Sequence, residues 1–139
     1  MTAETDQPSA PMTGQGETIL LVDDEETILT AVQRVLEENG YRVVTARNGK
    51  EALVTFVAHQ QEVKLVVTDL MMPEMDGLNL ARALRRLDQD VPIIGSSGLD
   101  PAAQTAEVEA GNIAEFLHKP YEQATLLATI RRHLPAAAD

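Results

Sequence analysis

Short apolar runs alternate with segments of helical periodicity along this chain, and that alternation limits the fold more than any other feature. The run Ile19-Leu20-Leu21-Val22 is apolar at every position, as expected for a strand that is buried on both faces. The other runs are Val43-Val44, Leu65-Val66-Val67, Ile93-Ile94 and Ile113 to Leu117. Strands separated by helices run parallel with right-handed crossovers, so the pattern predicts an α/β protein with a doubly wound, five-stranded parallel sheet.

The segments between the runs carry apolar residues at helical spacing. Each predicted helix has one apolar face, formed by Ile28, Val32, Val35 and Leu36; by Leu53, Phe56 and Val57; by Leu80, Leu84 and Leu87; and by Leu126, Leu127, Ile130 and Leu134. The segment 101–110 is the weakest helix, because only Ala and Val form its apolar side.

Turn and cap residues mark the expected helix ends. Asn39-Gly40 is expected to end the first helix, since Gly can adopt the left-handed conformation. Asp76 is expected to cap the third helix, and Asp100-Pro101 to open the fourth. Pro135 is expected to close the last helix.

The chain length predicts one domain with short tails. A chain of 139 residues is long enough for one ordinary domain and too short for two. Residues 1–16 contain two Pro, two Gly and almost nothing large and apolar, so we expect a disordered tail. The domain is expected over residues 17–135, followed by a short C-terminal tail over 136–139.

Composition excludes several classes of function. The formal net charge of −11 repels nucleic acids and anionic lipids, so neither is expected as a partner. The chain has no Cys, which excludes disulfides and thiolate chemistry and is compatible with a cytoplasmic location. No apolar run approaches the ~20 residues of a membrane span. The basic clusters Arg85-Arg86 and Arg131-Arg132-His133 fall late in predicted helices, where cations suit the helix dipole.

Polar residues follow four of the predicted strands. Asp23 and Asp24 come after the first run, Asp69 after the third, Ser96-Ser97 after the fourth and Lys119 after the fifth. Ligands of open parallel sheets bind beyond the carboxyl ends of the strands, so we expect these side chains to meet there. Clustered carboxylates repel one another, and Mg²⁺, which prefers oxygen ligands, removes the repulsion. A carboxylate beside such an ion can attack phosphorus, with the ammonium and a hydroxyl facing the phosphoryl oxygens.

Each of these features also has an ordinary structural explanation. Glu25 and Glu26 are equally suited to the start of a helix, a Lys before Pro is commonly a solvated turn residue, and a Ser pair commonly forms a turn. The site is favoured because all four features fall at the ends of the correct strands.

At these residues the chain resembles the receiver domains of bacterial response regulators, typified by the single-domain chemotaxis regulator. The likeness extends from about Glu17 to Leu134 and is carried by four motifs in order: LVDDE at 21–25, VTDLMMPEMDG at 67–77, VPIIGSSG at 91–98 and FLHKPY at 116–121. The resemblance implies a flavodoxin-like (βα)5 fold and a phosphoacceptor function in a two-component system.

The resemblance also implies a role for each acidic residue. Asp69 corresponds to the phosphoacceptor. Asp24 corresponds to a direct Mg²⁺ ligand, and Asp23 to one that helps directly or through water. The backbone carbonyl of Met71, two residues after the acceptor, corresponds to the remaining protein ligand.

The other implied roles belong to the switch. Ser97 aligns with the switch hydroxyl, Lys119 with the residue that pairs with the phosphoryl group, and Phe116 with the aromatic switch. The Lys119–Pro120 peptide is expected to be cis, as is usual in the family.

Two departures from the family pattern bear on kinetics. The switch hydroxyl is Ser97 where Thr is more frequent, and Ser is less restricted in rotamer. In the family, the positions of Met71 and Leu99 flank the path of the hydrolytic water. Apolar side chains at these positions offer that water no hydrogen bond. We therefore expect slow self-dephosphorylation.

The expected partners are a histidine kinase or histidine phosphotransfer domain as phosphodonor, and a downstream protein. The domain is expected to catalyse only its own modification and hydrolysis. It is either free-standing, which the initial Met and short polar tail favour, or excised from a hybrid histidine kinase or larger regulator.

Three other interpretations fit less well. A haloacid-dehalogenase-like phosphatase requires Asp-x-Asp after the first strand, whereas Glu25 stands two residues after Asp23. A flavodoxin-like ligand binder requires a loop rich in Ser, Thr and Gly to hold phosphate, and this loop is acidic. A degenerate receiver serving only as a scaffold is disfavoured because the expected catalytic residues are present.

Overall fold

A five-stranded parallel sheet forms the centre of the protein. The computed structural model describes residues 14–72, 77–97 and 112–134. The strands are β1 (Thr18–Val22), β2 (Arg42–Ala46), β3 (Val63–Asp69), β4 (Ile93–Ser97) and β5 (Glu115–His118). They pair in the order β2-β1-β3-β4-β5, and every neighbouring pair is parallel. The predicted doubly wound sheet is confirmed.

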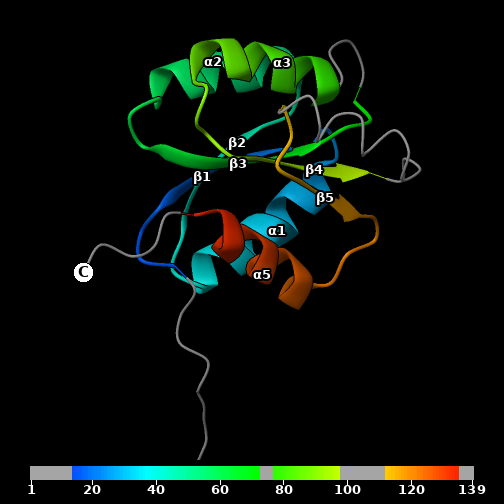
Figure 1. Ribbon diagram of the computed structural model, residues 1–139. Helices are drawn as coiled ribbons and strands as arrows, with labels where there is room; N and C mark the ends of the chain where they lie inside the picture. Colours follow the sequence, from blue (N-terminus) through cyan, green and yellow to red (C-terminus); the bar gives the residue numbers. More distant parts are fainter. Residues whose placement is uncertain (1–13, 73–76, 98–111, 135–139) are drawn as a thin grey trace, which may run out of the picture.

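Helices cover both faces of this sheet. The described helices are α1 (Glu26–Glu38), α2 (Gly49–Ala58), α3 (Gly77–Leu87) and α5 (Gln123–His133). In Figure 1, α2 and α3 lie over one face, and α1 and α5 lie over the other. The helix expected over 101–110, its start at Asp100-Pro101, the cap at Asp76 and the stop at Pro135 lie outside the described residues.

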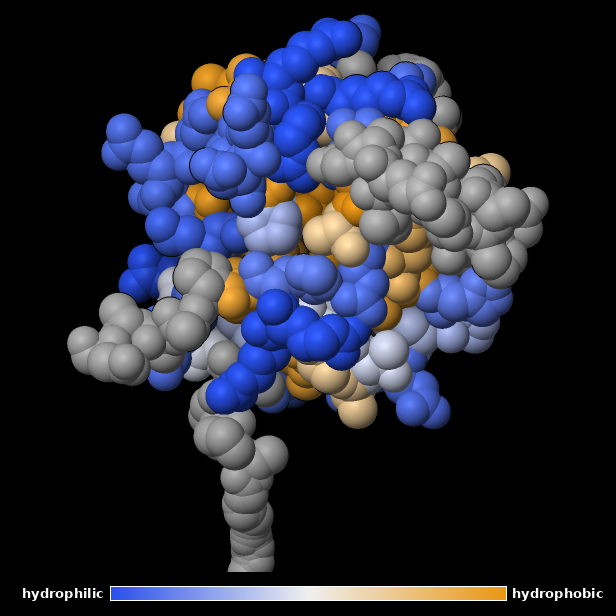
Figure 2. Space-filling view, viewed as in Figure 1, coloured by the Kyte–Doolittle hydropathy of each residue, from blue (hydrophilic) through white to orange (hydrophobic). Residues whose placement is uncertain are grey.

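The core consists of two mainly aliphatic clusters, one on each side of the sheet. Successive strand residues point to opposite faces, so β1 contributes Leu20 and Val22 to one cluster and Ile19 and Leu21 to the other. Both pairs are almost fully buried, as predicted for a strand covered on both sides. Figure 2 shows hydrophilic side chains over the outer helices and apolar ones mainly between the two helical layers.

Three predictions of burial were wrong. Val57 is 56% exposed and Leu87 is 42% exposed, although both share helical spacing with core residues. Helix α2 instead buries Gly49, Ala52 and Phe56, and α3 places its buried stripe earlier, ending at Leu84. Strand β2 is only partly buried, because it lies at the edge of the sheet, where fewer side chains cover it.

The segment just before β1 packs against the end of α1. Gly14 and Gly16 donate backbone hydrogen bonds to the carbonyls of Asn39 and Gly40, at 2.8 and 2.7 Å. A Cβ on Gly14 would lie 2.6 Å from the Gly40 carbonyl carbon, so this contact requires glycine. Gly40 has φ +94°, which confirms that Asn39-Gly40 ends α1. Residues 1–13 lie outside the described part of the chain.

None of the helices in the described ranges is long and apolar enough to span a membrane.

Candidate metal centre

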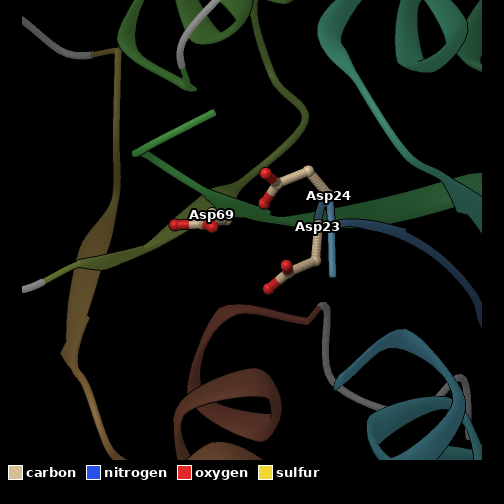
Figure 3. A group of neighbouring side chains, drawn as sticks. All are labelled: Asp23, Asp24 and Asp69. Atoms are coloured by element: carbon tan, nitrogen blue, oxygen red, sulfur yellow. The ribbon is translucent and has the colours of Figure 1, made fainter. Parts of the chain in front are cut away.

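Three carboxylates meet where β1 and β3 end. Asp23 and Asp24 follow β1 directly, and Asp69 is the last residue of β3. Figure 3 shows the three side chains converging, and one oxygen of each lies within 4.8 Å of the others. Asp23 and Asp69 are buried, whereas Asp24 is exposed. The expectation that these three side chains meet beyond the carboxyl ends of the strands is confirmed.

The loop between β1 and α1 is held through Asp23. Its backbone N–H donates to the carbonyl of Ala46 at 3.1 Å, which joins the loop to the end of β2. Its carboxylate Oδ1 accepts from the N–H of Glu25 at 2.9 Å. Glu25 is the N-cap residue of α1, and its side chain makes no cap hydrogen bond, so Asp23 holds this residue through its backbone N–H alone. Glu26 lies in the first turn, where its charge suits the helix dipole.

Asp69 is positioned by close backbone packing. Its Oδ1 accepts from the N–H of Met71 at 3.1 Å, which orients the carboxylate. A Cβ on Gly77 would lie 2.5 Å from the carbonyl oxygen of Asp69, so only glycine allows α3 to start this close to the site. The N–H of Gly77 also donates to the carbonyl of Leu70 at 3.1 Å.

Lys119 reaches the same cluster from the end of β5. Its Nζ lies 3.3 Å from Oδ2 of Asp69 and 3.5 Å from Oδ2 of Asp23. The Lys119–Pro120 peptide is cis, as expected. Burial opposes the charge on the ammonium, but the two carboxylates outweigh burial, and the pKa of Lys119 is raised.

The acidic cluster is short of positive charge. Burial is the main cause that raises the pKa of Asp23, and the nearby Asp69 carboxylate adds to it, while the Glu25 N–H and Lys119 act in the opposite direction. A divalent cation would relieve the same cost. Three carboxylate oxygens in one cluster suit an oxygen-preferring ion such as Mg²⁺, so the residues present fit a metal.

The remaining predicted residues lie at the same end of the sheet or near it. Ser97 ends β4 and pairs with His118 of β5, but its side chain lies outside the described part. Phe116 is half-buried and packs against the cluster beneath α2 and α3. The side chain of Met71 is exposed, and Leu99 lies outside the described residues.

Two residues near the site were not predicted. Tyr121 is half-buried, and burial raises the pKa of its hydroxyl. Its position directly after Lys119-Pro120 was the available signal. Arg47 forms an ion pair with Glu26 at 3.1 Å. No local pattern indicates that contact, because the two residues are 21 positions apart.

Comparison with known proteins identifies the family. The sequence model of the response regulator receiver domain matches residues 19–131, which is most of the chain. The chain belongs to the response regulator receiver domain family. It is therefore a receiver domain of the two-component signalling type.

Related sequences occur within longer proteins. The chain is 38% identical over 117 residues to the sensor kinase CckA of Brucella abortus, covering 84% of the chain and 12% of the kinase. It is 37% identical over 114 residues to the response regulator MprA of Mycolicibacterium vanbaalenii, covering 81% of the chain and 48% of that regulator. The chain thus spans half or less of the length of these two relatives.

Solved receiver structures share the fold. The receiver domain protein of Clostridium thermocellum matches with a TM-score of 0.79 at 28% identity, covering 84% of this chain and 92% of that one. The chemotaxis protein CheY4 of Vibrio cholerae matches with a TM-score of 0.78 at 30% identity, covering 86% and 99%.

Proposed function

We propose that Asp69 accepts a phosphoryl group from a phosphohistidine on a histidine kinase or a histidine phosphotransfer domain. The observation that carries the proposal is the convergence of Asp23, Asp24 and Asp69 on one point, with the Lys119 ammonium 3.3 Å from Asp69. One Asp69 oxygen forms the new bond to phosphorus as the phosphorus–nitrogen bond of the donor histidine breaks.

Mg²⁺ would be held by the carboxylates of Asp23, Asp24 and Asp69 and by the backbone carbonyl of Met71. Bound there, Mg²⁺ would supply positive charge to the oxygens of the transferring group. Asp23 also orders the ligand loop by accepting from the N–H of Glu25. Lys119 Nζ lies 3.3 Å from Oδ2 of Asp69 and would add its positive charge to that of the ion.

The response to phosphorylation is carried by Ser97, Lys119 and Phe116. The new negative charge at Asp69 attracts the Ser97 hydroxyl and the Lys119 ammonium. Phe116 then repacks into the space that Ser97 leaves, and the surface that includes β5 and α5 changes for a downstream protein partner. Phe116 supports this role by its place, because its half-buried ring lies on β5 and packs against the core cluster beneath α2 and α3.

We propose that the donor protein docks on a hollow beside Lys119. An apolar hollow of about 550 Å³ lies next to Lys119. Helix α1 and the connection between β5 and α5 provide its lining, which includes Ile28, Ala31, Val32, Pro120 and Tyr121. A donor whose phosphohistidine lies on a helix would cover this hollow while the histidine reaches Asp69.

We also propose a wider context for the domain. The domain spans residues 17–135, acts in the cytoplasm and binds neither nucleic acid nor membrane, as the charge of −11 favours. It catalyses only its own phosphorylation and dephosphorylation. It acts either alone or as part of a hybrid kinase or larger regulator.

Phosphotransfer from a panel of phosphorylated histidine kinases tests the proposal. The wild-type chain should take up the label rapidly from its cognate kinase in the presence of Mg²⁺, and Asp69→Asn should take up none. Equal labelling of Asp69→Asn would assign the acceptor to another residue.

A further inference from the structure

The metal-ligand loop is short, and one of its ligands has no side-chain support. Only residues 23–25 separate β1 from α1. Asp23 is fixed by its contacts with Ala46, Glu25 and Lys119. The exposed carboxylate of Asp24 has no hydrogen-bond or ion-pair partner within the described residues. Its direction therefore depends on how the backbone on either side of it is held.

Both flanks of Asp24 are tied to consecutive residues at the end of β2. On one side, the N–H of Asp23 donates to the carbonyl of Ala46 at 3.1 Å. On the other side, Nη1 of Arg47 lies 3.1 Å from Oε1 of Glu26. Arg47 is itself anchored, because its backbone N–H donates to Oε1 of Glu51 at 2.6 Å. The backbone N–H of Glu51 in turn donates to Oδ1 of Asn48, the N-cap residue of α2.

We infer that Arg47 is a positioning residue for the metal site: through Glu26 it holds the β1–α1 loop so that Asp24 faces Asp23 and Asp69. The inference rests on the proposed function, since it assigns a role toward the metal of that same site. Arg47 touches neither the metal nor the phosphoryl group in this role. Its effect is on the orientation of Asp24, whose carboxylate has no side-chain partner among the described residues.

If the Arg47–Glu26 pair acted only through its charges, loss of Arg47 would change the Mg²⁺ affinity in the opposite direction. Without a bracing role, loss of the Arg47 charge would make the site more negative and tighten cation binding. With a bracing role, loss of Arg47 loosens the ligand loop and weakens binding. Both members of the pair are well exposed, with side-chain exposures of 59% and 73%. Exposed pairs are weak, so the expected change in affinity is about two- to fivefold.

Calorimetric titration of Mg²⁺ into the full chain tests the inference, with no phosphodonor needed. The variants are Arg47→Ala, Glu26→Ala and the two combined. Arg42→Ala is the matched control, because it removes the same charge from the opposite end of β2. Thermal melting confirms that each variant is folded.

If Arg47 positions the loop through Glu26, Arg47→Ala and Glu26→Ala should each weaken Mg²⁺ binding, and the combined variant should lose no more. Arg42→Ala should bind Mg²⁺ as the wild type does. Tighter or unchanged binding by Arg47→Ala, with wild-type Mg²⁺ binding intact, would overturn the inference and leave the proposed function standing. A wild-type chain that binds no Mg²⁺ would overturn both.

Discussion

At the scale of single residues, Asp23 combines burial with close charged neighbours. It is buried, it accepts from the N–H of the N-cap residue Glu25, and it lies near both Asp69 and Lys119. Burial raises its pKa above the ordinary 3.8, with Asp69 adding to that effect. A proton is thus held on Asp23 at pH values where an ordinary Asp has lost it, and the metal competes with that proton.

Acidification is therefore expected to weaken Mg²⁺ binding from a pH above 3.8. In the metal-free protein, the stability that Asp23 contributes is fully present below pH 3.8 and is lost as the pH rises through its folded pKa. Calorimetric Mg²⁺ titrations at a series of pH values measure the first effect. An Mg²⁺ affinity that stays constant down to pH 3.8 would show that the pKa of Asp23 is not raised and that no proton on it competes with the metal.

At the scale of elements, Arg85 joins three segments that meet at the amino ends of β4 and β5. Its guanidinium donates to the carbonyls of Asp88 and Val91 at 3.1 and 2.8 Å, and to that of Asn112 at 3.1 Å. Arg85 and Arg86 both lie in the last turn of α3, as the sequence predicted, but the helix-dipole interpretation did not foresee these contacts of Arg85. Arg85 is half-buried, and this burial lowers the pKa of its guanidinium.

Arg85→Met is expected to destabilise the domain by about 2 kcal/mol, because three carbonyls lose a charged donor while the half-buried position limits the cost. The matched control is Arg86→Met in the same helical turn, which should change the free energy of unfolding by less than about 0.5 kcal/mol. Urea denaturation followed by circular dichroism compares them. Equal stability of the two variants would refute the assigned role of Arg85.

At the scale of the whole molecule, local patterns predicted the layers of the fold, and non-local contacts account for what they missed. The apolar runs predicted the five parallel strands, and the strand ends predicted that Asp23, Asp24, Asp69 and Lys119 would meet. The edge position of β2 and the exposure of Val57 depend on which elements become neighbours in space. Helical spacing alone does not contain that information, nor does it contain the long-range contact between Arg47 and Glu26.

The phosphorylated molecule is expected to lose its phosphoryl group slowly. Met71 has an apolar, exposed side chain two residues after the acceptor, so it offers no hydrogen bond to an attacking water. The decay of the phosphorylated species, followed by intact mass after chemical phosphorylation and removal of the donor, gives the lifetime. Decay with a half-life of seconds would contradict the expectation.

Chemical phosphorylation with acetyl phosphate, followed by tandem mass spectrometry to locate the modified residue, tests the central claim most directly. A cluster of Asp23, Asp24 and Asp69 that binds a divalent ion beside a nucleophilic carboxylate should produce one phosphorylated residue, Asp69. The modification should require Mg²⁺ and disappear when the metal is chelated. Modification of a different residue, or labelling of Asp69 that is unaffected by chelation, would contradict the account.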